Sequence, residues 1–239
     1  MMKLRISSNK PQKVIFSSLL SFDSRAPEPA QKNIPSWYKE MVSYGDLGKK
    51  PNGQGRIDKT IKKCIPVLDA INSGYLFFTH GDIYVSQRDG APYFEWTGEP
   101  IIEFHNVWQV EKHPAIKNKK INVPKYLNPW VMKTPKGYST LFVPPIHRDT
   151  PFKILEGIVD TDDYNTNVNF PFVLADSEFE GMIPAGTPIA QAIPFQRQEW
   201  SHEIGNDTDI NKARNIQMEM RQYFNNYYRN KFWVKKAYK

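Results

Sequence analysis

Three aspartates and a tyrosine lie close together in the middle of the sequence, directly after a short apolar run. Asp160, Asp162, Asp163 and Tyr164 follow Gly157-Ile158-Val159, so the acidic side chains come where a strand is expected to end. Carboxylates at such a place can cap the backbone amides of a polar turn that closes a hairpin. A positioned carboxylate can also act as a general base toward a bound water. Both interpretations of this acidic turn are open on the residues alone.

Two glycine-containing turns accompany the acidic turn. The first, residues 134–139, places Lys136 and Gly137 just before an apolar segment. The second, residues 184–188, leads into Ile189-Ala190-Gln191. We interpret the second as a tight turn feeding a buried strand, with the Gln191 side chain bonded to backbone.

The three segments resemble the signatures of the dUTPase and dCTP deaminase family, which has a β-clip core. Residues 157–164 read G-I-V-D-T-D-D-Y and are similar to the family's G-[VL]-I-D-x-D-Y. Residues 186–191 read G-T-P-I-A-Q and are similar to its G-x-x-I-A-Q, and Gly186 follows Asp160 by 26 residues, within a residue or two of the family's interval. Residues 134–139 occupy the place of its P-R-S-G phosphate-contacting turn, in which the deaminases carry a lysine. The resemblance covers about residues 133–197.

The resemblance implies roles for individual residues. Asp160 would be the candidate catalytic residue, orienting an attacking water, and Tyr164 would pack under a deoxyribose. The ligand-binding set would be completed by Lys136, Gly137, Asp162 and Gln191. Tyr164 lies one residue further from Asp160 than the family pattern has it, and one residue is enough to turn a side chain to the opposite face of a strand. A Mg²⁺ ion would be expected only if a triphosphate is bound.

Two family elements are absent from the sequence. The acidic A-G-x-D-L motif that supports the Mg²⁺-triphosphate site has its nearest counterpart in residues 73–77, with Leu76 where the acid should be. No glycine follows Gly205, so the glycine-rich C-terminal arm that closes over the phosphates is missing as well. We therefore expect a nucleotide-like or other small anionic ligand without dUTP or dCTP turnover, and the sequence leaves open whether the protein is an enzyme.

Other catalytic and metal signatures are not found. The five histidines are dispersed, with no pair at helical spacing, and the single cysteine rules out a cysteine pair, so no metal site is predicted. Cys64 lies between apolar residues, and we expect a buried, reduced thiol in a cytosolic protein. The sequence has no transmembrane run and no secretory signal, which places the protein in the cytoplasm, or in the virion if it is phage-encoded.

A broader resemblance spans nearly the whole chain. Its pattern is similar to a family of uncharacterised proteins found in tailed phages and bacteria, and it is carried by residues 34–39, 60–66, 128–130, 133–139, 157–162 and 193–197. Two hypotheses follow. The protein binds a small ligand, or it is a phage virion structural or assembly protein that uses the clip as an oligomeric scaffold. A homo-oligomer, with a trimer favoured, is expected in either case, and other phage proteins are possible partners.

The expected fold is mainly β, with short N-terminal helices and a C-terminal helix. We predict a single domain over residues 1–239, with an N-terminal extension and helices in 1–72 and a β-rich clip core in 73–200. Residues 207–239 would form a C-terminal helix, over about residues 208–230, and a basic-aromatic tail. The chain carries a net charge of +7, with lysines concentrated between Lys112 and Lys125 and cations in the tail from Arg229 to Lys239. Because Phe232, Trp233 and Tyr238 lie among the tail's cations, we expect it to pack against the body or a neighbouring subunit, with a tail exchanged between subunits as the favoured form.

Overall fold

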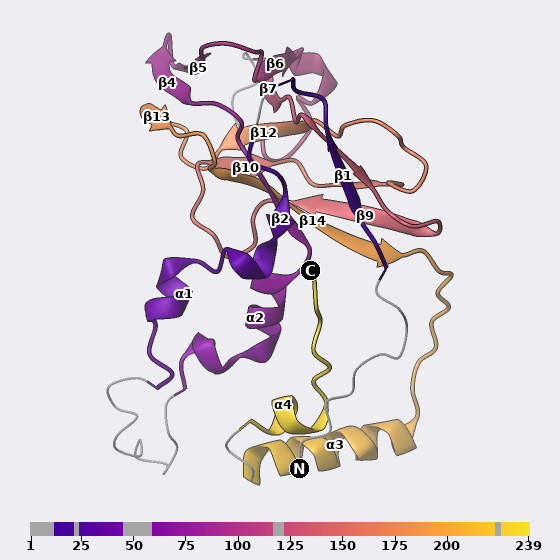
Figure 1. Cartoon of the computed structure of the whole chain (residues 1–239). Helices are drawn as coiled ribbons and strands as arrows, with labels where there is room; N and C mark the ends of the chain where they lie inside the picture. Colours follow the sequence, from indigo (N-terminus) through magenta and orange to yellow (C-terminus); the bar gives the residue numbers. More distant parts are fainter. Residues whose placement is uncertain (1–11, 22–23, 45–58, 117–121, 223–225) are drawn as a thin grey trace.

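The chain folds mainly as antiparallel β-sheet, with a group of short helices at one end (Figure 1). The structure is a computed structural model, and it describes residues 12–21, 24–44, 59–116, 122–222 and 226–239. The expected mainly β class with short helices and a helix near the C-terminus is confirmed. The loop expected at residues 49–55 lies outside the described residues.

A five-stranded antiparallel sheet forms the centre of the molecule. Its order is β11-β9-β14-β3-β2, and the strands are β11 (Gly157–Val159), β9 (Tyr138–Val143), β14 (Pro188–Gln196), β3 (Tyr75–Phe78) and β2 (Glu28–Pro29). The longest strand, β14, pairs with β9 on one side and with β3 on the other. All four residues of β3 are buried, as expected of an apolar strand in the interior of a sheet.

Three smaller sheets complete the β structure. A four-stranded sheet has the order β10 (Phe152–Ile154), β12 (Phe170–Leu174), β7 (Val123–Tyr126) and β6 (Ile102–His105). A three-stranded sheet contains β13 (Gly181–Ile183), β4 (Ile83–Arg88) and β5 (Ala91–Glu95), and β1 (Ile15–Ser18) pairs with β8 (Trp130–Lys133). The β4–β5 turn has positive φ at both Asp89 and Gly90, the geometry of the two-residue hairpin that this Asp-Gly pair predicts.

Aromatic side chains fill the core between the sheets. The Phe77 ring packs edge-on against Phe170 at 5.8 Å between ring centroids, and Phe152 packs against Phe172 at 5.1 Å. Tyr126 is also fully buried in this cluster. Edge-to-face aromatic pairs stabilise a core by about 0.5–1.5 kcal/mol beyond the burial of their area. The core therefore holds the sheets in a fixed relation, which fixes the turns at their ends.

The N-terminal helices lie below the sheets in Figure 1. They are η1 (Ala30–Lys32), α1 (Ser36–Glu40), η3 (Ile61–Lys63) and α2 (Ile65–Asn72), and η4 (Val107–Gln109) lies at the opposite end. Pro66 stands in the first turn of α2, where its missing N–H costs no helical hydrogen bond. The predicted burial of Cys64 was wrong: the residue lies just before α2, outside the apolar cores, and it is exposed.

Two other expectations are corrected by the structure. The apolar pattern of residues 152–159 predicts one continuous strand, but these residues form β10 and β11, which belong to different sheets. The C-terminal helix is also not continuous. It divides into α3 (Asp207–Gln222) and α4 (Tyr227–Lys231), and Asn226 before α4 has a left-handed φ of 61°. A left-handed residue cannot continue an α-helix, which accounts for the break.

The C-terminal tail packs against the body of its own chain, which is one of the two arrangements that its aromatic residues predicted. The Trp233 indole N–H donates to the Asp69 carboxylate of α2, and Lys236 pairs with the same carboxylate at 2.6 Å. The Tyr238 ring packs edge-on against Tyr75 at 6.0 Å between centroids.

Among the described residues, no helix has the length and apolarity needed to span a bilayer.

Candidate functional site

Two turns lie together at one end of the central sheet. Strands β9 and β11 are antiparallel neighbours, with Thr140 opposite Val159. The residues just before β9 and just after β11 therefore lie at the same end of this pair of strands. This brings the Lys136-Gly137 turn beside the acidic turn at residues 160–164. The end of β14 meets them there, because Gln196 pairs with Tyr138.

Three buried threonine hydroxyls connect the two turns. The Thr161 hydroxyl lies 2.8 Å from that of Thr134 and 2.7 Å from that of Thr140. The Thr134 amide also donates to the Thr161 carbonyl at 3.2 Å. Because buried hydroxyls are costly without partners, this chain of hydrogen bonds defines how the turns fit together.

Asp162 is the buried acid of the site, and its carboxylate is fully engaged within the protein. Arg197 donates to both oxygens, from Nη1 to Oδ1 at 2.9 Å and from Nη2 to Oδ2 at 2.6 Å. The Gly137 amide also donates to Oδ2 at 2.8 Å. The Arg197 guanidinium, followed by the Gly137 amide, holds the pKa of the Asp162 carboxyl well below its usual range. Asp162 therefore joins the two turns to the end of β14 and is not available to a ligand.

Asp160 is the exposed acid. One of its oxygens, Oδ1, accepts from the buried Ser139 hydroxyl at 2.6 Å and lies 3.2 Å from Arg197 Nη1. The side chain is nevertheless 66% exposed, so its second oxygen can meet a ligand. The Asp160 carbonyl accepts from the amides of Asp163 and Tyr164, which closes the turn and directs the chain toward residues 165–169.

A surface hollow of about 640 Å³ lies beside the acidic turn. Its chemistry combines two carboxylates, two carboxamides, an aromatic ring and three aliphatic side chains. The lining residues are Ile158, Val159, Asp160, Asp163, Tyr164, Asn167, Val168 and Asn169. The extra residue before Tyr164 thus leaves its ring in the same hollow as Asp160, about half exposed.

Lys136 is next to the hollow but does not line it. Its ammonium lies 3.7 Å from Asp163 Oδ1, and both side chains are exposed. Gly137 has a φ of +86°, a conformation that glycine adopts without strain, and its amide is held by Asp162. Of the predicted ligand-binding set, the structure therefore places Asp160 and Tyr164 in the hollow and Lys136 at its rim.

Gln191 lies elsewhere, in the interior of the central sheet. Its oxygen accepts from the Ile146 amide and from Arg148, and its amide nitrogen donates to the carbonyls of Ala70 and Ser73. A glutamine side chain has two donor hydrogens and two acceptor lone pairs, so these four bonds fill its capacity. Gln191 holds α2 and the 144–148 loop to β14, and it is not placed to contact a ligand in the hollow.

The geometry places limits on the chemistry of this site. The Gly137 amide and the Arg197 guanidinium are donors suited to an anion, but the Asp162 carboxylate already occupies them. Within the described ranges, no group of three or more histidine, cysteine or carboxylate side chains is arranged to hold a metal ion. The two acids that line the hollow favour hydroxyl and amino groups of a ligand as hydrogen-bond donors.

A second hollow, of about 450 Å³, surrounds His80. His80 Nδ1 lies 2.6 Å from the Tyr126 hydroxyl, and burial lowers the pKa of the imidazole below its ordinary value of 6.5. The unfolded chain therefore binds a proton near pH 6.5 that the folded chain does not bind. We expect this residue's contribution to stability to be complete above about pH 6.5 and to decrease as the pH falls toward the folded pKa.

The pH dependence can be measured by melting the wild type and His80→Gln between pH 8 and pH 5. The difference in melting temperature between the two proteins should change below pH 6.5, with the wild type losing stability faster on acidification. Glutamine is chosen because its side chain can keep a hydrogen bond to Tyr126 without titrating. If the melting temperatures of the two proteins differ by the same amount at every pH in this range, His80 does not titrate differently in the folded and unfolded states.

Comparison with known proteins gives no family model that matches the chain and no curated protein that is similar to it. The resemblance to dUTPases and deaminases therefore stays a prediction from short motifs. Because a fold alone does not define a function, the hollow beside Asp160 has to carry the functional argument.

Proposed function

We propose that this protein binds a nucleoside-like or nucleotide-like small molecule in the hollow beside Asp160, without hydrolysing a triphosphate. The observation that carries the proposal is the half-exposed Tyr164 ring in one hollow with an exposed carboxylate and two carboxamides, those of Asn167 and Asn169. A tyrosine face is a stacking surface for a base or a sugar, and stacking on an aromatic side chain is worth about 1–3 kcal/mol per base. Carboxylates and carboxamides bind the hydroxyl and amino groups of such a ligand.

The charge of the hollow indicates which part of a nucleotide it would hold. Asp160 and Asp163 line it, whereas Lys136 lies at the rim. A phosphate inside the hollow would be repelled by the two carboxylates, and the donors of the neighbouring turn already hold Asp162. The base and sugar therefore belong inside and any phosphate belongs outside, toward Lys136. We expect a nucleoside to bind about as well as its monophosphate.

A thermal-shift panel of nucleosides, nucleotides, sugars and sugar phosphates tests this function. A ligand present at about 100 times its Kd stabilises the folded state by about 2.7 kcal/mol, which is easily seen in a melting curve. Titration calorimetry on the best compound should then show a Kd weakened roughly 5- to 150-fold by Tyr164→Ala, the equivalent of one lost stacking interaction. Asp160→Asn should also weaken the binding of this compound relative to the wild type. It should not change the fold, because the Asp160 side chain is exposed.

The matched control is Tyr93→Ala, which removes another exposed tyrosine from β5, outside the hollow. Its affinity should equal that of the wild type. If no compound in the panel raises the melting temperature, or if the best compound binds Tyr164→Ala as tightly as the wild type, the hollow is not the binding site. Release of pyrophosphate from dUTP or of ammonia from dCTP at about 1 s⁻¹ or faster would contradict the proposed lack of turnover.

A second candidate function is a component of an assembly, such as the phage virion that the broader sequence resemblance suggests. The observation in its favour is the large apolar side chains that remain exposed after β14, chiefly Trp200 and Ile204. A protein that only binds a small ligand has no use for them. This candidate requires a surface that holds copies of the chain together.

A further inference from the structure

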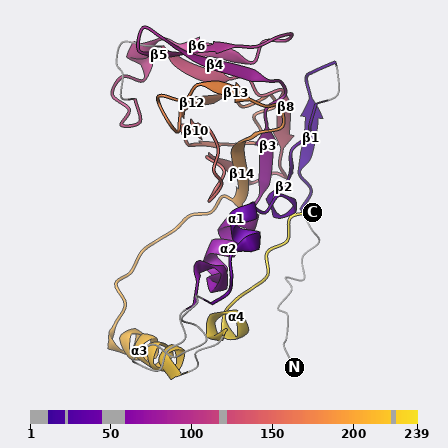
Figure 2. The same ribbon diagram turned by 90° about the vertical axis from the view of Figure 1, so that its left-hand side faces the viewer.

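Residues 198–222 form an arm that leaves the body and has almost no contact with it. The arm begins directly after Arg197, whose amide donates to the Gly137 carbonyl. It runs as an extended segment to α3, which stands apart from the sheets in two perpendicular views (Figures 1 and 2). Within the described residues, no hydrogen bond joins residues 198–205 to the body. The chain then returns through α4 and the tail.

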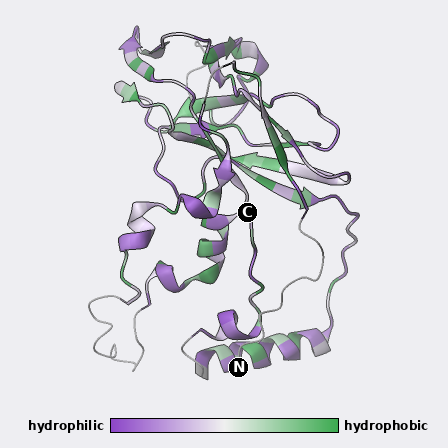
Figure 3. Cartoon of the chain, in the orientation of Figure 1, coloured by the Kyte–Doolittle hydropathy of each residue, from purple (hydrophilic) through white to green (hydrophobic). Residues whose placement is uncertain are grey.

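The arm carries large apolar side chains that are exposed, which is unusual for a solvated loop. Trp200 is 84% exposed and Ile204 is 92% exposed. In α3, Ile210, Ile216 and Met220 recur at helical spacing and are also exposed, and Figure 3 shows apolar residues among the polar ones of this helix. Side chains of this kind on one continuous segment are typical of a protein interface.

The charge of the arm identifies the surface that it fits. Residues 198–211, the first part of the arm, contain four acids and no lysine or arginine, and the whole arm, residues 198–222, contains five acids and three basic residues. The arm therefore carries −2 and, because the whole chain is +7, the remainder carries +9. A nucleic acid or an anionic membrane would repel such a segment, whereas the body of another copy would attract it. The most basic stretch is the tail, where Arg229, Lys231, Lys235, Lys236 and Lys239 occur without an acid between them.

The tail also offers apolar contacts. Trp233 and Tyr238 face the body, but Phe232 and Val234 remain exposed between the cations. In the same chain α3 lies beside α4, where the Tyr227 hydroxyl donates to the Glu219 carboxylate, but residues 198–205 of the arm lie away from the tail in both views (Figures 1 and 2). We propose that the arm, residues 198–222, docks on the basic tail, residues 229–239, of a second copy of this chain.

The size of the arm agrees with an intermolecular role. Its 25 residues match the roughly 20–30 residues that each partner contributes to a stable interface. The arm and the tail are different surfaces, so the assembly closes either as a head-to-tail ring or as a two-fold pair in which each arm docks on the tail of the other copy. This contact between arm and tail is the surface that the assembly function requires, and it does not involve the hollow beside Asp160.

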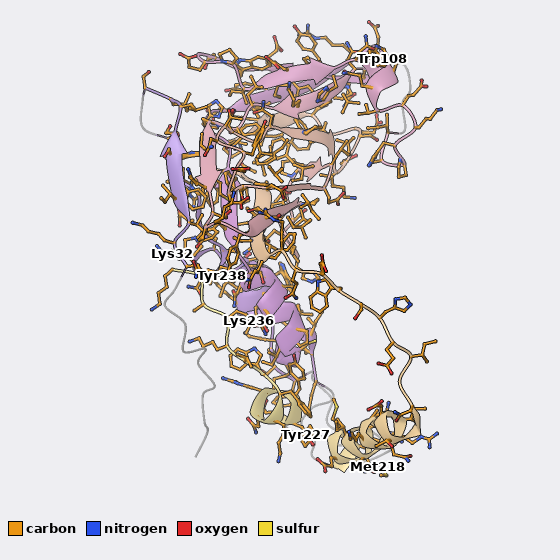
Figure 4. All side chains as sticks on the ribbon, turned by 90° about the vertical axis from the view of Figure 1, so that its right-hand side faces the viewer. Lys32, Trp108, Met218, Tyr227, Lys236 and Tyr238 are labelled. Carbon is orange, nitrogen blue, oxygen red and sulfur yellow. The ribbon has the colours of Figure 1, made fainter. Side chains whose placement is uncertain are left out.

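Oligomeric mass tests the proposal. Light scattering behind a size-exclusion column should give the wild type a mass of two or three times 27.8 kDa. The double variant Trp200→Ser/Ile204→Ser should give 27.8 kDa at the same concentration. It should still unfold cooperatively as a folded monomer, because neither side chain packs within its own chain. The matched control is Trp108→Ser, which removes another exposed tryptophan at the end of the molecule opposite Met218 of α3 (Figure 4) and should keep the wild-type mass.

Disulfide trapping locates the contact and shows that it joins two chains. In a Cys64→Ser background, one sample carries Ile204→Cys and the other carries Val234→Cys. Mixed and oxidised, they should give a covalent dimer on a non-reducing gel, whereas either sample alone should not. A monomeric wild type, an unchanged mass in Trp200→Ser/Ile204→Ser, or no mixed dimer would overturn the proposal. Ligand binding to the hollow can be measured on a monomer as well as on an oligomer. If the arm–tail contact is not found, the function proposed for the hollow is therefore unaffected.

Discussion

Replacing Arg148 with methionine is expected to lower the free energy of unfolding by about 3 kcal/mol, roughly 10 °C in melting temperature for a chain of this size. Arg148 lies between the N-terminal segment, α2 and β14, and its guanidinium donates to four backbone carbonyls and one side chain. The acceptors are the carbonyls of Ala30, Asn33, Ile71 and Ile146 and the Gln191 amide oxygen, at 3.0–3.3 Å. Without the guanidinium, these partly buried oxygens lose their donor, and each unsatisfied group costs free energy.

Arg148 holds its position by hydrogen bonds and not by an ion pair. Among the described residues no carboxylate pairs with it, and burial lowers the pKa of the guanidinium to about 10. It still carries its charge near neutral pH. Arg148→Lys keeps a positive charge but has three donors in place of five and no planar fork. Lysine should therefore recover only a small part of the lost stability.

Chemical denaturation of the wild type, Arg148→Met and Arg148→Lys measures these differences. The control is Arg88→Met, because Arg88 lies on an exposed hairpin, pairs there with Glu95 and stacks on Tyr93. Exposed pairs of this kind contribute about 0–1 kcal/mol, so the control should stay close to the wild type. Full recovery by lysine would show that charge alone matters at position 148 and that the carbonyl contacts do not.

The sequence predicted much of the sheet structure, and its errors have local physical causes. Strand β7 escaped notice because Pro124 and Lys125 interrupt its apolar pattern. Strands β10 and β11 were joined because residues 152–156 contain no glycine or proline, although the chain changes sheets between the two strands. A change of sheet depends on which neighbours the strand finds, and that information is not local to the segment.

The C-terminal helix was predicted too long for a similar reason. Its apolar stripe continues in the sequence through Tyr227, and the pattern alone gives no end. The structure ends the pattern at Asn226, a residue type that adopts the left-handed conformation more easily than most. That asparagine was the available signal. The packing of the tail was predicted correctly because large aromatics rarely stay in water without a docking surface.

The candidate site shows which residues motifs can find. The acidic turn and the Lys136 turn were located by their glycines and acids, and the structure brings them together. Arg197 was missed, although it contacts Asp160, Asp162 and the start of β9. It lies 35 residues after Asp162, and only the register of β14 on β9 brings it back. Contacts set by strand register have no signature in the local sequence.

The second large effect concerns this missed arginine. Arg197→Met should be the most destabilising single substitution at the site, because it leaves the buried Asp162 carboxylate with only the Gly137 amide as a donor. The cost comes from an unpaired charge, so removing the charge should relieve it. The double variant Asp162→Asn/Arg197→Met is therefore expected to melt at a higher temperature than Arg197→Met alone. The control Lys136→Met breaks an exposed contact and should leave the melting temperature unchanged.

The pH dependence of the stability lost in Arg197→Met separates the ion pair from packing effects, which do not depend on pH in this way. In the wild type, Arg197 lowers the pKa of Asp162, so the stability gained from the pair is present above the ordinary value of 3.8 and is lost as the pH falls below it. In Arg197→Met the Gly137 amide still donates to the carboxylate, but the main cause of the lowered pKa is gone, so the pKa of Asp162 should move up toward its ordinary value. The difference in stability between the wild type and Arg197→Met should therefore stay constant from pH 7 to pH 5 and become smaller as the pH falls below 3.8. A difference that stays constant below pH 3.8 as well would show that lost packing accounts for it. A difference that becomes smaller there would show that one ion pair holds together the two turns beside which Asp160 and Tyr164 line their hollow.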